Sequence, residues 1–571
     1  MSGEAIVRNG GCLGSGPWAW RNAGNVCVQD DFSIAAGMQG QTGVIFSALI
    51  AAVLLAFGMA WLVAGLYRRR MVALMRSGPI QGASQVETRE AFNMPAERPL
   101  AVLDAVANRR SQTRFLLALS GLSLLIGLSQ SWLAITFIYD DREFSFNRWL
   151  VLGIVYAWPM VLGWGLVLRW SWGRVLLAIL AYVAGLTVLA MLRSEVDQTL
   201  TDVLSWLLVV VALPIVITLL ISISGRIRAV APYLLPIFLL LSIASVLVLQ
   251  RMAASSSNPP AWVYPILDLM GATGTILFFT FAPWLLLAWP TYALGRGLAR
   301  AYREKRFSDL TYLFAAYWFV VLVSSTFPAV EGVGAAGLTQ LLPWLWIPVA
   351  LALARDWLKP TVTPPTLLVL RVFQRDTAVE RLFDRVVERW RLTGNTVLIA
   401  GTDLVSRTLD PDELFAFLNG RLAERFIASE AEVPRRLAEL DLAPDPDGRY
   451  RVNECYCFDT TWQAALHALV RTSDVVLMDL RGFRAENRGC RFELGVLAQS
   501  PHLRRVVLLR DAATDLDAAT MDLAGAPAER FIWLDAGRLD GGKTRQVLAA
   551  LFGEAAEGRK SLRAVEFDRD T

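Results

Sequence analysis

The sequence predicts a polytopic α-helical membrane protein of about nine spans, followed by a C-terminal cytoplasmic α/β doubly wound domain. Of the 571 residues, 55% are hydrophobic and only 19% are charged, whereas soluble domains average about 25% charged residues. Apolar runs of about 20 residues, the length that crosses a bilayer, recur up to residue 355. Beyond residue 365, short β-rich runs alternate with helical patterns, which is typical of a largely parallel sheet.

These patterns divide the chain into an N-terminal extracytoplasmic segment (1–42), a transmembrane domain (43–358), a proline-rich linker (359–365) and a cytoplasmic domain (366–571). The first segment opens with polar and Gly-rich sequence, so a cleavable signal peptide is not predicted. Its two cysteines, Cys12 and Cys27, could form a disulfide on the outer face of the membrane or remain unpaired.

Nine apolar stretches are predicted to cross the membrane as helices. They are 43–67, 115–139, 149–168, 175–192, 204–223, 231–250, 267–289, 310–327 and 337–354. Prolines in several of them predict kinks. The last stretch is interrupted by Pro343 and Pro348, so eight spans plus a re-entrant segment is an alternative interpretation.

Basic residues gather in alternate loops, which indicates the orientation of the chain. Arg68, Arg69 and Arg70 follow the first span, and the loop 290–309 contains five further basic residues. The intervening loops are richer in acidic residues, such as Glu195. Because basic loops stay in the cytoplasm, we predict a multi-pass protein of the cell (inner) membrane, with its N-terminus outside and its C-terminal domain in the cytoplasm.

The interiors of the predicted spans contain almost no ionisable residues. Because ion and proton pathways usually contain such residues at mid-membrane, an anchor, sensor or assembly platform is favoured over a transporter with a regulatory domain. A pore that forms on activation is a further alternative. The net charge of +4 gives no indication of nucleic-acid binding. The expected partners are the lipid bilayer, a nucleotide ligand and further copies of the chain, bound through the spans or the cytoplasmic domain.

Six strands are predicted in the cytoplasmic domain, at 366–373, 396–401, 450–458, 474–480, 504–509 and 530–536. Helical patterns occupy 377–390 and the segments that follow the second, third and fourth strands. Asp410 and Pro411 are typical of the start of a helix, and Asp459 is expected to cap the next one. The stretch 428–449 is predicted to be a loop or an insertion.

Polar residues and glycines follow the predicted strands at the edge where parallel sheets bind their ligands. The candidate binding residues are Gln374, Arg375 and Asp376 after the first strand, Gly401, Thr402 and Asp403 after the second, and Asp479, Arg481, Gly482, Phe483 and Cys490 after the fourth. Caps and turns would also explain many of these residues. They explain Glu493 less well, because it is expected beside the apolar stripe of its helix, near the edge of the sheet.

The segment 474–495, DVVLMDLRGFRAENRGCRFELG, resembles part of the TIR (Toll/interleukin-1 receptor) domains. In that family a polar turn after a strand leads into a helix with the pattern Trp-Cys-x-x-Glu-Leu, and VFQRD at 372–376 is similar to the family's opening strand. The segment is also similar to nucleoside 2-deoxyribosyltransferases, whose Asp…Gly-x-x-x-Glu-x-Gly pattern matches Asp479, Gly489, Glu493 and Gly495. The resemblance covers the C-terminal domain, which departs from TIR domains in having Gly489 in place of Trp and a long insertion before the third strand.

Both families break an N-glycosidic bond, so the resemblance implies that Glu493 is the catalytic carboxylate that stabilises or traps the developing oxocarbenium ion. It further implies a flavodoxin-like fold, NAD as a possible substrate, no required cofactor, and a role in signalling or defence. Arg375, Arg481 and Arg484 could bind the phosphates of a substrate. The alternative hypothesis is a non-catalytic nucleotide-binding or protein-interaction module on a membrane sensor.

Two other patterns are not assigned a function. Residues 537–544, GRLDGGKT, match the phosphate-binding P-loop, but only 27 residues follow Thr544, too few for the rest of a P-loop nucleotidase. Cys455 and Cys457 would share one face of a strand, but no further ligands accompany them, so no metal site is predicted.

Overall fold

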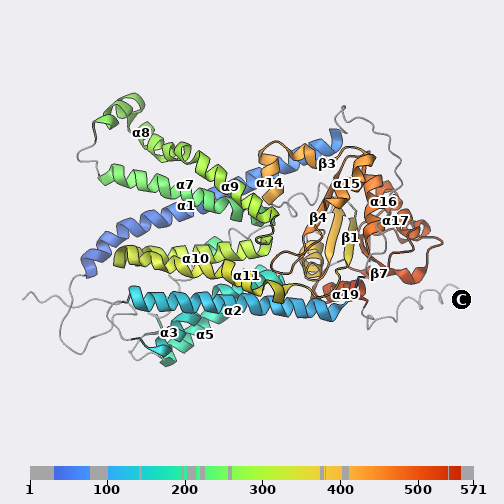
Figure 1. Ribbon diagram of the computed structural model, residues 1–571, viewed down its shortest axis with the longest axis horizontal. Coiled ribbons are helices and arrows are strands. Elements are labelled where there is room, and N and C mark those ends of the chain that lie inside the picture. Colours follow the sequence, from blue (N-terminus) through green and yellow to red (C-terminus); the bar gives the residue numbers. More distant parts are fainter. Residues whose placement is uncertain are drawn as a thin grey trace, which may run out of the picture.

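A bundle of apolar helices occupies one end of the computed structural model, and an α/β domain occupies the other (Figure 1). The structure describes residues 31–77, 101–139, 144–193, 199–201, 214–218, 225–254, 260–372, 379, 381–400, 411–537 and 539–553. The helices of the bundle are α1 (Asp31–Ser77), α2 (Ala105–Phe137), α3 (Phe146–Tyr156), α4 (Pro159–Leu168), α5 (Trp172–Arg193), α7 (Gly225–Ala254), α8 (Tyr264–Leu286), α9 (Ala288–Arg303), α10 (Asp309–Val333) and α11 (Trp346–Leu358), with the 3-10 helices η1 (Ala261–Val263) and η2 (Gly334–Leu345).

Six described segments are long and apolar enough to cross a membrane. They are Leu49–Met75, Ala105–Phe137, Val230–Ala253, Ala261–Leu286, Asp309–Thr326 and Gly334–Leu358. Helices α3 and α4 add a seventh if they form one span, bent by 41° where Pro159 opens α4. The prediction of a polytopic membrane protein is therefore confirmed at six to seven candidate spans. The count of nine stays a prediction, because most of 204–223 lies outside the described residues and the apolar part of α5, Gly173–Leu189, is short.

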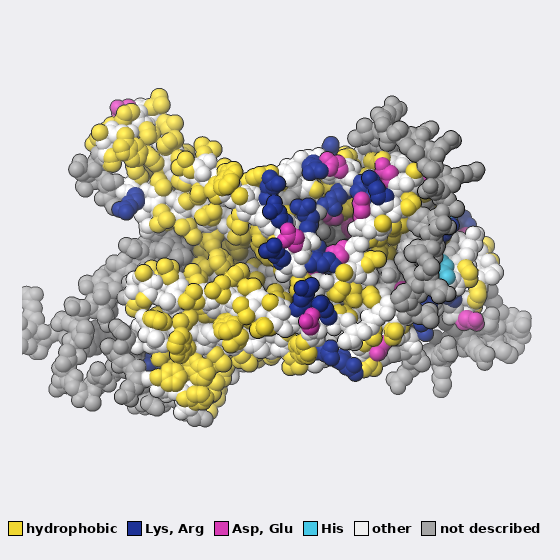
Figure 2. Space-filling view, in the orientation of Figure 1, with side chains coloured by type: hydrophobic (Ala, Val, Ile, Leu, Met, Phe, Trp, Pro, Cys, Tyr) yellow, Lys and Arg dark blue, Asp and Glu magenta, His cyan; other side chains and the backbone are white. Residues whose placement is uncertain are grey.

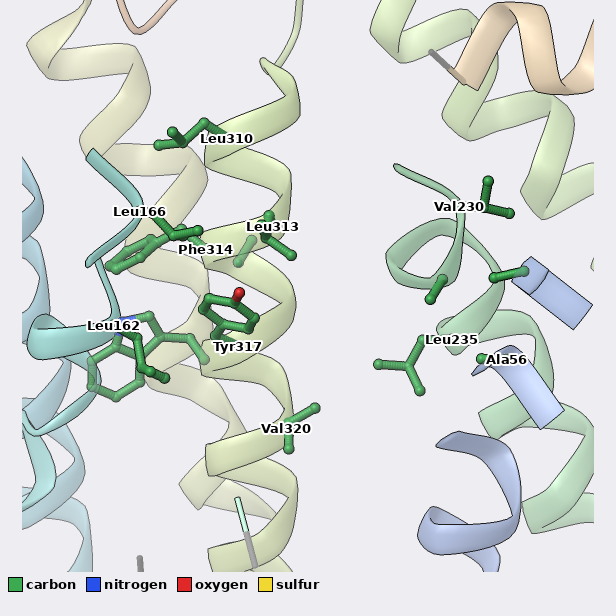
Figure 3. Packing of buried hydrophobic residues seen from close by; sticks show 14 of the residues in the cluster. Ala56, Leu162, Leu166, Val230, Leu235, Leu310, Leu313, Phe314, Tyr317 and Val320 are labelled. Atoms are coloured by element: carbon green, nitrogen blue, oxygen red, sulfur yellow. The ribbon is translucent and has the colours of Figure 1, made fainter. Parts of the chain in front are cut away.

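The helices pack through a continuous apolar core. Figure 3 shows Leu162 and Leu166 of α4 beside Phe314 of α10, and Leu235 of α7 close to Ala56 of α1. All five side chains are at most 9% exposed. The same cluster continues into buried residues of the α/β domain, among them Leu414, Phe426 and Phe458. The two parts of the chain therefore share one core.

The α/β domain contains a seven-stranded sheet in the order β3-β4-β2-β1-β5-β6-β7, with every strand parallel to its neighbours. The strands are β1 (Thr366–Arg371), β2 (Asn395–Ile399), β3 (Phe426–Ile427), β4 (Val452–Cys457), β5 (Val475–Asp479), β6 (Arg505–Arg510) and β7 (Phe531–Asp535). The prediction of a parallel α/β sheet is confirmed. The central strands are buried on both faces, as their continuous apolar runs predict.

Helices cover both faces of this sheet, so the domain is doubly wound. The helices are η3, a π-helix (Phe383–Val387), α13 (Glu388–Trp390), α14 (Pro411–Leu418), α15 (Val433–Ala438), α16 (Trp462–Thr472), α17 (Arg488–Ala498), α18 (Leu516–Asp522) and α19 (Gly541–Phe552). Helices α15 to α18 pack on one face, and η3, α13 and α19 pack on the other.

Three details differ from the prediction. Strand β3 was not predicted, because two residues are too short to produce a strand pattern. The stretch 428–449 contains the short helix α15 rather than only a loop. Asp459 is exposed and does not cap α16, which has Thr461 at its N-cap position without a side-chain cap hydrogen bond. The hydroxyl of Thr461 is used instead in the turn after β4, where it accepts a hydrogen bond from the Phe458 N–H (3.1 Å).

A cluster of charges with buried arginines and partly exposed carboxylates, which we call the docking network, joins the bundle to the α/β domain. It consists of Arg169 and Asp309 from the ends of α4 and α10, and Glu388, Arg391 and Arg449 from the α/β domain. Arg391 reaches Glu388 at 2.9 Å and Asp309 at 3.2 Å, and Arg449 reaches Asp309 at 3.4 Å. Glu388 also pairs with Arg169 and Arg449. Each carboxylate thus meets at least two guanidinium groups.

The stretch 445–451 forms a second contact with the bundle. The Arg451 guanidinium lies 3.8 Å from the ring centre of Tyr302 and pairs with Asp445 at 2.8 Å. Gly448 has a φ of +81°, and a Cβ there would lie 2.2 Å from the carbonyl oxygen of Leu358 at the end of α11. Only glycine fits this close approach without strain.

Three loops that the sequence predicts to be cytoplasmic lie beside the α/β domain. Arg169 pairs with Glu388, Lys305 pairs with Asp441, and Tyr67, next to the first basic cluster, packs edge-on against Phe417 of α14 at 5.5 Å. The basic loops and the α/β domain therefore lie at the same end of the bundle (Figure 1).

Candidate functional site

The strand order places the expected ligand site between β1 and β5. From β1 the chain runs to β2 on one side, and from β5 it runs to β6 on the other. Ligands of doubly wound sheets bind beyond the carboxyl ends of the strands at such a switch point. Here β1 ends at Arg371 and β5 ends at Asp479, and these two residues are direct neighbours in the sheet. The predicted site residues Arg481, Gly482 and Phe483 follow shortly after the end of β5.

Asp479 and Arg481 form a buried ion pair at this edge. The Arg481 Nε donates to Asp479 Oδ1 at 2.7 Å, and Nη2 donates to Oδ2 at 2.5 Å. A third hydrogen bond joins Arg481 Nη1 to the Ala536 carbonyl at 3.3 Å. Arg481 is 3% exposed. Its guanidinium is thus committed to neighbours within the domain, although the sequence suggested a contact with substrate phosphates.

Gly482 and Phe483 shape the turn that follows. Gly482 has a φ of +73°, a conformation that favours glycine, and its N–H donates to Asp511 Oδ1 at 2.9 Å. Phe483 is fully buried in the apolar core on the α17 face of the sheet. Its carbonyl accepts a hydrogen bond from the Asp515 N–H at 2.9 Å. These two residues fix the path of the chain and do not offer side chains to a ligand.

Glu493 is the buried carboxyl group of the site. It lies on α17 and is 4% exposed, and its Oε2 atom has no hydrogen-bond partner among the described residues. Burial raises the pKa of Glu493 to about 8, although the Arg371 guanidinium opposes this shift. A buried carboxyl that keeps its proton near neutral pH is typical of functional sites.

Two neighbours on α17 define the surroundings of Glu493. The Cys490 thiol is buried and donates to the Arg371 carbonyl at 3.9 Å, and burial raises its pKa, so it is a packing residue and not a nucleophile. Gly489 lies one helical turn before Glu493 and is exposed, and a Cβ there would meet no atom of the described residues within 4 Å.

Arg371 also lies at this candidate site, although the sequence pattern did not predict it. It is 2% exposed and donates to the Ile399 carbonyl at 3.4 Å. A basic residue at the last position of an otherwise apolar, buried strand was the available signal. The predicted neighbours Gln374, Arg375, Asp376, Gly401, Thr402 and Asp403 lie outside the described residues.

The patterns that were left without a function have structural explanations. Helix α19 follows the P-loop-like segment, but the Asp540 side chain accepts a hydrogen bond from the Lys543 N–H at 2.8 Å, which puts a carboxylate where a phosphate would bind. Cys455 and Cys457 are buried free thiols. Among the described residues, no group of three or more His, Cys, Asp or Glu side chains could hold a metal ion. Cys12 and Cys27 lie outside the described residues.

Comparison of the chain with protein-family models, curated proteins and solved structures found no match.

Proposed function

We propose that the α/β domain binds a nucleotide at the β1–β5 edge and cleaves its N-glycosidic bond, with NAD as the candidate substrate. The observation that carries this proposal is Glu493, a buried carboxyl at the switch point of the sheet with one oxygen unpartnered among the described residues. The resemblance to two families of N-glycosidic enzymes supports it.

The chemistry requires only one carboxylate. The bond between the anomeric carbon and the nicotinamide nitrogen breaks, the nitrogen takes the electron pair, and positive charge develops on the ribose. Water then adds to the anomeric carbon and releases a proton, which gives ADP-ribose and nicotinamide. Glu493 stabilises the positive charge once it is ionised. The cationic nicotinamide ring favours that ionised form, because a nearby positive charge lowers the pKa of a carboxyl group.

The second candidate function is nucleotide or protein binding without catalysis. One observation favours it: the pKa of about 8 keeps Glu493 mostly protonated at pH 7, and a neutral acid stabilises an oxocarbenium ion poorly. In this case the domain acts as a signalling module, and ligand binding changes its contacts with the bundle or with a second copy.

The decisive experiment uses the full-length protein in lipid nanodiscs, incubated with NAD and followed by liquid chromatography. We expect nicotinamide release by the wild type and a loss of about a hundredfold or more in Glu493→Gln, because removing one transition-state contact has effects of this size. The matched control is Glu486→Gln, an exposed carboxylate seven residues earlier in the chain, which should leave the rate unchanged.

The outcomes separate the two functions. Equal rates in wild type and Glu493→Gln would exclude Glu493 as the catalytic group. If no variant releases nicotinamide but the wild type binds NAD in equilibrium dialysis, the binding module replaces the enzyme. If NAD is neither cleaved nor bound, both proposals fail for this nucleotide.

The topology is part of the proposal. The six candidate spans, the α3–α4 pair, α5 and the stretch 204–223 would together make nine crossings. With nine crossings and the basic loops on the cytoplasmic side, the N-terminus lies outside and the α/β domain lies in the cytoplasm. We propose that the membrane is a bacterial inner membrane. Labelling of single cysteines introduced at exposed Glu486 in the α/β domain and at exposed Phe146 at the start of α3 tests this orientation with a membrane-impermeant reagent.

A further inference from the structure

A cavity of about 560 Å³ lies where helix α9 meets the α/β domain, away from the β1–β5 edge. Its charged lining consists of six arginines and a single glutamate: Arg296, Arg300, Arg303, Arg421, Arg425, Arg436 and Glu424. We call this cavity the arginine pocket. Figure 2 shows Lys and Arg side chains gathered between the hydrophobic surface of the bundle and the α/β domain.

One wall of the arginine pocket is a stripe on α9. Tyr292, Arg296, Arg300 and Arg303 follow each other at intervals of four, four and three residues, so they share one face of the helix. Arg296 and Arg300 are exposed, and Arg296 lies 5.7 Å from the ring centre of Tyr292. A lone stripe of this kind would be explained by the preference for basic residues on the inner side of a membrane.

The opposite wall belongs to a different part of the chain, which that preference does not explain. Arg421, Arg425 and Arg436 come from the segments around η4 (Leu422–Arg425) and α15. Glu424 is already paired with Arg421 at 2.8 Å. Arg436 is paired with Glu439 at 3.0 Å. Two separate elements nevertheless bring six arginines to one cavity whose lining contains a single glutamate, and this excess of positive charge favours an anionic ligand.

The position of the arginine pocket relative to the bilayer indicates which anions can reach it. Helix α9 continues from a candidate span, and its first turns carry Trp289 and Tyr292, which are 76% and 52% exposed. Such aromatic residues mark the level of the lipid head groups. At a rise of about 1.5 Å per residue, Arg296 lies roughly 6 Å from Tyr292 along the axis of α9, and Arg303 lies roughly 16 Å from it. The pocket thus extends from the head-group level into the aqueous side.

We infer that the arginine pocket binds a ligand with two or more phosphate groups. Arginine forks suit phosphate oxygens, and guanidinium groups on both walls and at different depths suit more than one phosphate. The phosphates belong either to the head group of an anionic lipid, which enters beside Tyr292, or to a free compound from the aqueous side.

The test uses full-length protein in phosphatidylcholine nanodiscs. One arm adds pyrophosphate, and inorganic phosphate serves as the probe with a single phosphate group. The other arm replaces part of the lipid with cardiolipin, and phosphatidylglycerol at equal total charge serves as the lipid with a single phosphate group. The readout is the midpoint of thermal unfolding together with binding of radiolabelled pyrophosphate. The variants are Arg296→Gln/Arg300→Gln on one wall and Arg421→Gln on the other. The control is Arg110→Gln, an exposed arginine on α2 outside the pocket.

We expect one diphosphate probe to raise the unfolding midpoint more than its monophosphate counterpart. Both pocket variants should bind this diphosphate probe at least about tenfold more weakly than the wild type, whereas the control variant should bind it as the wild type does. Stabilisation by pyrophosphate would identify a free ligand, and stabilisation by cardiolipin alone would identify a lipid. Absence of stabilisation by either probe would overturn the proposal. So would binding that only the α9 variant weakens, because a simple surface charge on α9 would then explain it.

Discussion

Carboxyl groups have different surroundings at two places in the molecule. In the docking network each carboxylate meets at least two guanidinium groups within ion-pair distance. At the β1–β5 edge, Glu493 has an oxygen without a hydrogen-bond partner among the described residues, and its pKa rises to about 8. Glu493 is 4% exposed, whereas the side chains of Glu388 and Asp309 are 17% and 42% exposed. Glu493 therefore combines deeper burial with the lack of a partner for one oxygen among the described residues, and this combination distinguishes it from the carboxylates that join the two parts of the chain.

The largest expected effect comes from breaking the docking network. Arg449→Met removes a 2% exposed guanidinium from Asp309 and Glu388 and leaves their negative charges less compensated. We expect a loss of roughly 3–5 kcal/mol in the free energy of unfolding. Thermal unfolding in nanodiscs measures it, with exposed Arg471→Gln on α16 as the control. A loss no larger than that of the control would mean that the network does not stabilise the protein.

The second effect tests the isolated carboxyl through pH. The folded protein holds the proton of Glu493 up to a pKa of about 8, whereas the unfolded chain releases it near 4.5. Unfolding therefore releases a proton between these values, and the stability of the wild type falls as pH rises through this window. Between pH 4.5 and pH 7 we expect a loss of about 3 kcal/mol that Glu493→Gln does not show. Unfolding profiles of both proteins that stay parallel from pH 5 to pH 8 would contradict the raised pKa.

A smaller effect is expected at the glycine beside the docking network. Gly448→Ala forces an L side chain into positive φ and towards the Leu358 carbonyl, which should reduce stability by roughly 1–2 kcal/mol. The variant should also become more sensitive to proteolysis between residues 359 and 365, because the contact with α11 is lost. Gly489→Ala, where a Cβ meets open space, is the matched control and should be harmless to stability.

The smallest effect concerns an uncharged contact between the two parts of the chain. Asn108 of α2 is buried and donates to the Arg389 carbonyl at 2.8 Å and to Thr393 Oγ1 at 3.0 Å. Asn108→Ala should cost about 1 kcal/mol, the usual net value of a neutral hydrogen bond. If Asn108→Ala and Arg449→Met reduced the free energy of unfolding equally, the ion pairs of the docking network would contribute no more to stability than these neutral hydrogen bonds.

The fold was largely predictable because its signals are local. Long apolar runs predict the spans, and short buried runs predict six of the seven strands. The helix at Pro411 begins where proline favours a start. The two-residue strand β3 and the polar first turns of α2, which dock on the α/β domain through Asn108, depend on tertiary contacts. No sequence period reports such contacts.

The candidate site was predictable only in part. Asp479, Cys490 and Glu493 stand out because they surround one turn of the chain. Arg371 escaped notice because its importance depends on sheet pairing with Asp479 across more than a hundred residues. The arginine pocket is assembled from positions between 292 and 436, and no short segment contains enough of it to be recognised.

The docking contacts have a consequence for the motion of the α/β domain. The α/β domain is held at the ends of α2, α4, α10 and α11, so the proline-containing linker does not act as a swivel. The bundle and the α/β domain therefore behave as one body.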